Sequence, residues 1–160
     1  MNTNPPSNST TMARPGLAIF WGGLISGVLD LTSAFVAWGL RGITPGIILR
    51  GIASGLLGLT AYSGGLVITA LGGVLHFVVA FGAATVFYLA SRKLEFMTQR
   101  AVLCGLIYGE LVYFFMYCVV LPLSAFHKGP FTVETLVTGP IGHPLLIGLP
   151  IALAVRRFAN

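Results

Sequence analysis

Four long apolar segments constrain this chain more than any other feature of its sequence. Each has 21 to 26 residues, and they are Leu17–Leu40, Gly65–Ala90, Ala101–Leu123 and Thr135–Val155. A helix needs about 20 apolar residues to cross the hydrocarbon core of a bilayer. The segments therefore predict an all-α fold, a polytopic membrane four-helix bundle.

The charge content excludes the main alternatives. Only 8% of the 160 residues are charged and the mean hydropathy is +0.91, whereas soluble domains carry about 25% charged residues. So few charges cannot cover the surface of a soluble enzyme. The nine basic residues lie singly or in pairs, so no stripe for nucleic acid is expected. The chain also lacks the HExxH, P-loop and Gly-x-Ser-x-Gly motifs, which argues against an enzyme.

The basic residues also predict the orientation, because cytoplasmic loops are enriched in Lys and Arg. Six of them fall on one side of the predicted spans and three on the other. The majority side holds Arg14, Arg92, Lys93, Arg100, Arg156 and Arg157, and the minority side Arg41, Arg50 and Lys128. Residues 14–160 thus form a transmembrane domain with both termini in the cytoplasm. Residues 1–13 are predicted to be a disordered polar tail, in which Met12 is an alternative start.

The two outer connections differ in character. Thr44-Pro45 is typical of an N-cap followed by proline in the first helical turn. It predicts a short helix over Pro45–Leu59 that lies along the outer surface, re-enters the membrane slightly or packs on a neighbouring helix. The second connection, Ser124–Glu134, contains Gly129-Pro130 and is predicted to be a loop.

The two halves of the chain resemble each other. Gly23–Gly27 and Gly105–Gly109 differ at one of five positions, and each is followed by a span with one histidine and then by a basic pair. This order predicts two helical hairpins in parallel orientation, related by an axis along the membrane normal. The glycine pairs predict close helix packing.

Each predicted span carries one ionisable residue near its middle. A charge at the bilayer centre costs about 2.5–3.5 kcal/mol on insertion scales, so such residues turn inward and find partners. We therefore expect one polar layer at mid-depth, with Asp30 paired to His76 and Glu110 paired to His143. Tyr113 and Tyr117 extend the layer from Glu110 toward the outer face.

This layer admits three functions. It can fix helix packing and nothing more. It can relay protons in a proton-linked small-solute carrier that works as an oligomer, an idea that the proline-broken fourth span favours. Alternatively, His76 and His143 can ligate haem b, or the carboxylates and histidines can hold a divalent metal.

The pattern resembles the YagU-like family of small four-helix bacterial inner-membrane proteins. The resembling residues are Gly23–Gly27, His76 with Phe77–Tyr88, Gly105–Gly109, Gly142-His143 and Arg156-Arg157. The resemblance implies a location in the bacterial inner membrane, an unassigned role and no catalytic residues. Expected partners are the lipid bilayer and a second copy or another membrane subunit.

Overall fold

The computed structural model describes residues 14–126 and 139–158, and all regular structure in these ranges is helical. The first half contains α1 (Pro15–Gly39), α2 (Pro45–Leu57), the 3-10 helix η1 (Gly58–Ser63) and α3 (Leu66–Lys93). The second half contains α4 (Phe96–Gln99), α5 (Ala101–Phe115), the π-helix η2 (Met116–Val120), α6 (Leu121–Leu123), the π-helix η3 (Pro144–Gly148) and α8 (Leu149–Phe158). The predicted tail at residues 1–13, most of the predicted outer loop and residues 135–138 lie outside the described residues.

Five segments are long and apolar enough to cross a membrane, one more than the sequence predicted. They are Pro15–Gly39, Pro45–Ser63, Leu66–Lys93, Ala101–Leu123 and Gly139–Phe158. The chain is therefore an integral membrane protein with several apolar helices. The additional segment combines α2 with η1 and coincides with the predicted outer helix.

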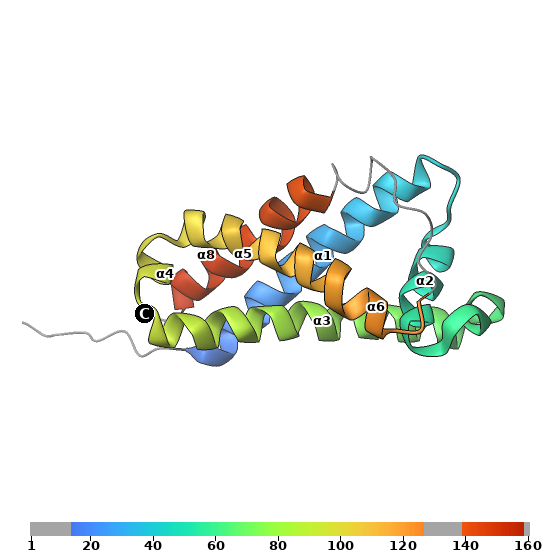
Figure 1. Ribbon diagram of the computed structural model, residues 1–160, viewed down its shortest axis with the longest axis horizontal. Coiled ribbons are helices and arrows are strands. Elements are labelled where there is room, and N and C mark those ends of the chain that lie inside the picture. The colour runs from blue at the N-terminus through green and yellow to red at the C-terminus, as the bar shows by residue number, and fades with distance from the viewer. Residues whose placement is uncertain (1–13, 127–138, 159–160) are drawn as a thin grey trace, which may run out of the picture.

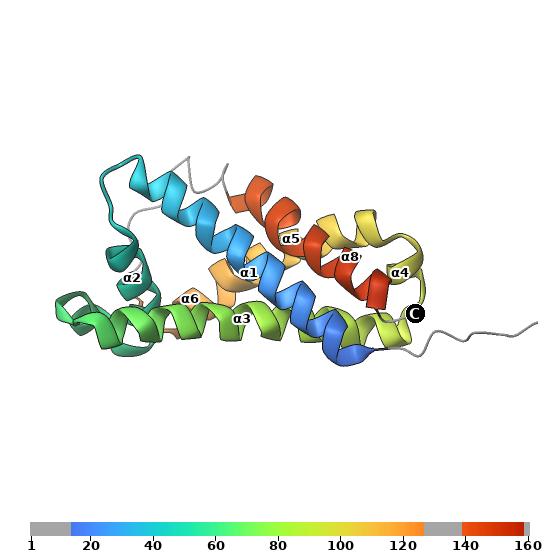
Figure 2. The same ribbon diagram turned by 180° about the vertical axis from the view of Figure 1, so that it is seen from behind.

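The additional segment is arranged differently from the other four. Figures 1 and 2 show that α1, α3, α5 and α8 run along the long axis, whereas α2 lies across the end where α1 stops and α3 begins. Its 13 residues extend about 20 Å, short of the roughly 30 Å hydrocarbon core. Gly58, with φ of +64°, ends it in a conformation that favours glycine. Thr44 precedes α2 as predicted but makes no capping hydrogen bond through its side chain.

The long helices form a row that is open on one side, rather than a closed bundle. α1 packs against both α3 and α8, and α5 packs against η3 and α8. α3 and α5 make little direct contact, and an apolar cavity of about 400 Å³ lies between them. Tyr108 bridges this side, because its hydroxyl donates a 2.7 Å hydrogen bond to the carbonyl oxygen of Ala83.

Small residues form most of the helix contacts, and large apolar side chains face outward. The buried residues are mainly alanine, glycine and serine, whereas Phe20, Trp21 and many leucines and valines are exposed. This distribution is expected in lipid, where large side chains gain nothing by leaving the hydrocarbon and small ones let helices approach. A cluster that includes Phe87, Ile151 and Val155 fills the end of the molecule opposite α2.

The glycine pairs pack as predicted. A Cβ on Gly27 would lie 2.8 Å from the ring of Phe77 on α3. A Cβ on Gly109 would lie 2.5 Å from the carbonyl oxygen of His143. Each pair thus contacts the histidine-bearing helix of its own half, which agrees with the predicted repeat. The duplication itself stays a prediction.

The prolines of the last span do not interrupt it. Gly139–Phe158 continues as one helical segment, and the five residues from Pro144 to Gly148 form a π-helix. Proline lacks the N–H that an α-helix needs at an interior position, and a wider turn accommodates this loss. A second π-helix, η2, follows α5. The predicted irregularity is therefore a local change in helical pitch.

Candidate functional site: an intramembrane polar cavity

Three of the four predicted ionisable residues line one cavity of about 140 Å³. Asp30 comes from α1, His76 from α3 and His143 from the start of the last span, and all three are half-buried. The remaining wall consists of Ser26, Gly27, Ile52, Val79, Ala80, Ala83, Val112, Met116 and Ile147. The cavity thus brings together side chains that are more than 100 residues apart.

The three residues also share one depth. Asp30 lies fifteen residues after the start of α1, and His143 fifteen residues before the end of α8. These two helix ends meet, because the Arg14 amide donates a 2.8 Å hydrogen bond to the Phe158 carbonyl oxygen. At about 1.5 Å per residue, both side chains lie about 22 Å from this end. His76, across the same cavity, lies ten residues into α3 from the opposite end.

His76 bonds to backbone rather than to a carboxylate. Its Nε2 lies 2.9 Å from the carbonyl oxygen of Gly27 on α1. A carbonyl oxygen only accepts, so Nε2 carries the proton and Nδ1 is left as an acceptor in the neutral ring. The missing side chain of Gly27 permits this approach, since Phe77 and Ala80 already occupy the space of a Cβ.

His143 also bonds to backbone, but within its own helix. Its Nδ1 lies 3.1 Å from the carbonyl oxygen of Gly139. By the same argument Nδ1 is the donor and Nε2 remains as an acceptor. The ring is 5.2 Å from that of Tyr113, centroid to centroid, in an edge-on arrangement. The next residue, Pro144, fixes the backbone that carries the histidine.

The predicted pairs, Asp30 with His76 and Glu110 with His143, are wrong. Within residues 14–126 and 139–158 no ion pair joins either pair, and both histidines donate to carbonyl oxygens instead. No fully buried side-chain oxygen in these ranges lacks a hydrogen-bond partner. The Asp30 carboxylate therefore reaches the cavity rather than being sealed in the protein.

The predicted layer of four is also wrong, because Glu110 is not among the residues that line the cavity. From α5 and η2 the cavity receives Val112 and Met116. Glu110 precedes Val112 by two residues, which turns it about 200° around the helix axis. It lies nine residues into α5, against fifteen residues into α1 for Asp30, and is therefore about 9 Å nearer to the α4 end of the molecule.

Tyr113 and Tyr117 form an aromatic cluster, and the extension of the polar layer from Glu110 through these two residues stays a prediction. Their rings are stacked with centroids 5.9 Å apart, and Tyr113 also contacts His143. Tyr113 is buried against Gly139, where its ring occupies the space of a Cβ. The cluster therefore supports the His143 side of the cavity.

Two contributions to the site were not predicted. Ile52 lines the cavity, so α2 contributes to its wall. Tyr108 holds Ala83, which lines the same cavity, through its hydrogen bond. Tyr108 occupies the one position at which the two glycine motifs differ, where the first motif has the cavity residue Ser26. This difference between the two motifs is the sequence feature that could have identified Tyr108.

Cofactor binding by these residues is not supported by the geometry. No group of three or more His, Cys, Asp and Glu residues in the described parts of the chain is placed to hold a metal ion. The cavity of about 140 Å³ is smaller than the roughly 300–1,000 Å³ of typical ligand pockets, so haem does not fit between His76 and His143.

No family model, curated protein or solved structure matches this chain. The resemblance to the YagU-like family stays a prediction.

Proposed function

We propose that this integral membrane protein is a proton-linked carrier of a small polar solute, and that Asp30, His76 and His143 form its proton-binding centre. The observation that carries the proposal is their convergence on one cavity from three helices. Ionisable residues are rare in membrane spans because each is costly there, and they mark ion and proton pathways.

The cavity has room for the water that proton exchange requires. Each water molecule needs about 10–15 Å³ of cavity volume and polar groups with which it can form hydrogen bonds. About 140 Å³ therefore holds several waters among one carboxylate and two imidazoles. Each neutral histidine donates through one ring nitrogen and accepts through the other, so each can pass a proton between waters and Asp30.

The π-helices favour movement at the same place. Met116 begins η2, and His143 directly precedes η3, and both line the cavity. Short π segments inside helices occur frequently at functional sites, because their wider turns allow adjustment of the backbone. Four crossings are few for alternating access, so we expect the carrier to work as an oligomer.

The proposed topology has four crossings and both termini in the cytoplasm. The hydrogen bond between Arg14 and Phe158 supports it, because five complete crossings would put the two ends on opposite membrane surfaces. In this topology α2 lies in the interface at the outer end. The basic residues near the chain ends then face the cytoplasm.

A purely structural role is the second candidate. The 2.9 Å bond from His76 to Gly27 joins α1 and α3 at a close glycine contact, which is what a packing device does. The two candidates differ in what they require of Asp30. A structural role requires the hydrogen bond from His76 to Gly27, whereas a carrier requires the carboxylate of Asp30.

The test is proton flux into proteoliposomes, driven by a pH gradient and followed with an internal pH-sensitive dye. Asp30→Asn keeps the shape of the side chain but cannot ionise, and we expect it to lower the flux about tenfold or more. Glu110→Gln is the matched control, since it removes a mid-span carboxylate outside the cavity. Flux from the unaltered protein no greater than from empty liposomes, or equal flux with Asp30→Asn, contradicts the carrier.

A further inference from the structure

The described polar side chains that line the polar cavity share one chemical property, which is that none has a proton to donate into it. The Ser26 hydroxyl donates to the carbonyl oxygen of Gly23, at 3.3 Å. The neutral histidines donate through Nε2 of His76 and Nδ1 of His143, also to carbonyl oxygens. A carboxylate such as that of Asp30 only accepts. These four side chains can therefore serve a solute as hydrogen-bond acceptors only.

The cavity also holds a negative charge that its own wall does not balance. No Lys or Arg is among the described residues that line it. Across residues 14–126 and 139–158, no ion pair involves the Asp30 carboxylate. A charge in a membrane span is costly unless it finds a partner, so a positive ligand is stabilised there and an anion is repelled. The cavity therefore favours a cation that carries N–H groups.

The rest of the wall is apolar, which favours an organic cation over an inorganic one. It consists of Gly27, Ile52, Val79, Ala80, Ala83, Val112, Met116 and Ile147. In the described parts of the chain, no three His, Cys, Asp and Glu residues are placed to share a metal ion. At about 10–15 Å³ for each water-sized group, the cavity of about 140 Å³ admits about ten such groups. An ammonium or guanidinium group with a short alkyl chain fits this volume.

We propose that the polar cavity binds a small organic cation, an alkylammonium or an alkylguanidinium, and that this cation and the proton exchange on Asp30. The inference rests on the proposed function and names its solute. One carboxylate balances one positive charge, so the proton and the cation occupy the cavity in turn. As the cation arrives, Asp30 releases its proton to water in the cavity, and one proton leaves for each cation that enters.

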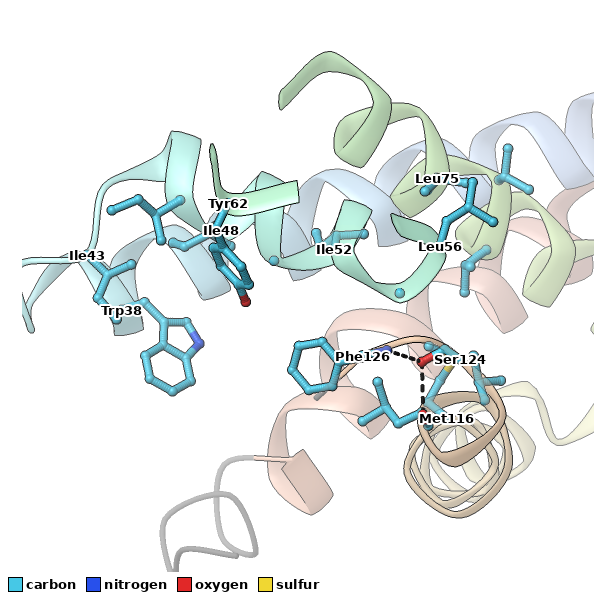
Figure 3. Close-up of a pocket in the computed structure, with 17 residues that line it drawn as sticks. Trp38, Ile43, Ile48, Ile52, Leu56, Tyr62, Leu75, Met116, Ser124 and Phe126 are labelled. Atoms are coloured by element: carbon cyan, nitrogen blue, oxygen red, sulfur yellow. Dashed lines mark hydrogen bonds between the residues drawn. The ribbon is translucent and has the colours of Figure 1, made fainter. Parts of the chain in front are cut away.

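A larger apolar groove beside α2 gives the cation a route toward the outer end of the molecule in the proposed topology. The groove has a volume of about 640 Å³, and Ile52, Val79 and Met116 line both the groove and the polar cavity. Figure 3 shows Ile52 and Met116 in the wall of the groove. These side chains form the partition between the two spaces, and the unbranched chain of Met116 adapts most easily. Entry from the outer end therefore needs a change of side-chain rotamers at this partition.

Binding is measured first, with radiolabelled methylguanidinium and the full chain in detergent. A guanidinium group stays positively charged and carries only N–H donors. Tetramethylammonium has the same charge but no N–H group, and urea resembles guanidinium in shape but is neutral. We expect saturable binding, with each of these two compounds at least about tenfold weaker as a competitor than unlabelled methylguanidinium.

Two variants separate the cavity carboxylate from charge elsewhere in the spans. Asp30→Asn keeps the shape of the side chain but removes its charge, and we expect it to weaken methylguanidinium binding about tenfold or more. Glu110→Gln removes a mid-span carboxylate outside the cavity, and as the matched control it should leave binding unchanged. The variants are compared at equal amounts of folded protein.

Exchange is measured in the proteoliposomes of the proton-flux assay, with methylguanidinium trapped inside. We expect the trapped cation to raise the inward proton flux about fivefold, because the return of the carrier is often rate-limiting and now proceeds with a cation bound. Trapped tetramethylammonium should leave the flux unchanged.

Three outcomes would overturn the inference while leaving the carrier in place. They are the absence of saturable methylguanidinium binding, equal competition by tetramethylammonium or urea, and Asp30-dependent proton flux that trapped methylguanidinium does not alter. Failure of the proposed function differs from all three, because the proton flux then equals that of empty liposomes.

Discussion

At the scale of single residues, neighbouring backbone decides which hydrogen bonds the two histidines form. His76 and His143 were both expected beside carboxylates, yet each donates to a carbonyl oxygen. A close glycine contact brings the backbone of Gly27 within reach of His76, whereas His143 reaches the carbonyl oxygen of Gly139 in its own helix. Asp30 consequently has no histidine partner and lines the cavity.

The glycine contacts predict a sharp difference between two alanine substitutions. Gly109→Ala should destabilise the protein by about 1–3 kcal/mol, because its methyl group would meet the backbone of His143 and Pro144, which cannot yield as a side chain can. Gly142→Ala, in open space on the facing segment, should change stability by less than about 0.5 kcal/mol. Thermal unfolding in detergent measures both, and equal losses would contradict the packing described for Gly109.

At the scale of helical elements, the last span shows how proline shapes the site. Pro144 lies at the start of η3 directly after His143, and Pro150 lies six residues later in α8. Pro144 directly follows His143, which lines the cavity, whereas Pro150 has no neighbour in sequence that lines it. Two prolines in one span thus have different expected effects on function.

Replacing each proline by alanine separates these effects. Both substitutions restore a backbone N–H, so both should leave the melting temperature equal or higher. Pro144→Ala should also lower proton flux about threefold or more, because a regular turn moves the His143 ring away from Tyr113 and the cavity. Pro150→Ala should retain the flux of the unaltered protein. Equal proton flux from both variants in proteoliposomes would show that the π-helix is not needed for proton transport.

At the scale of the whole molecule, two features favour the proposed topology of four crossings. Arg14 meets Phe158 at one end, and α2 lies across the other end (Figure 1). The length and composition of Pro45–Ser63 alone allow a fifth crossing. The arrangement of the long helices favours an interfacial position for α2 instead.

Cysteine labelling tests this topology in a background with Cys104 and Cys118 replaced by alanine. Gly46→Cys and Thr60→Cys lie near the two ends of the α2–η1 segment. We expect an impermeant maleimide to label both from the outer surface of sealed cells, and Arg157→Cys only after the membrane is opened. Labelling of Gly46→Cys and Thr60→Cys from opposite sides would show that the segment crosses the membrane.

The long helices were largely predictable from the sequence. Predicted and observed bounds agree within about four residues, for instance Gly65–Ala90 against Leu66–Lys93. A helix that crosses hydrocarbon must be long and apolar, and its backbone groups must form their hydrogen bonds within the helix. The residue types in the sequence are enough to predict where such helices lie. The close packing of the glycine pairs follows from the same residue types.

The rotation of each helix about its own axis was decided only by the tertiary structure. In lipid every face of a helix is apolar, so hydropathy fixes the depth of a residue but not the direction in which it points. Asp30, His76 and His143 line one cavity, whereas Glu110 does not. The backbone partners of the histidines and the groove beside α2 depend on contacts between distant segments, which no local pattern specifies.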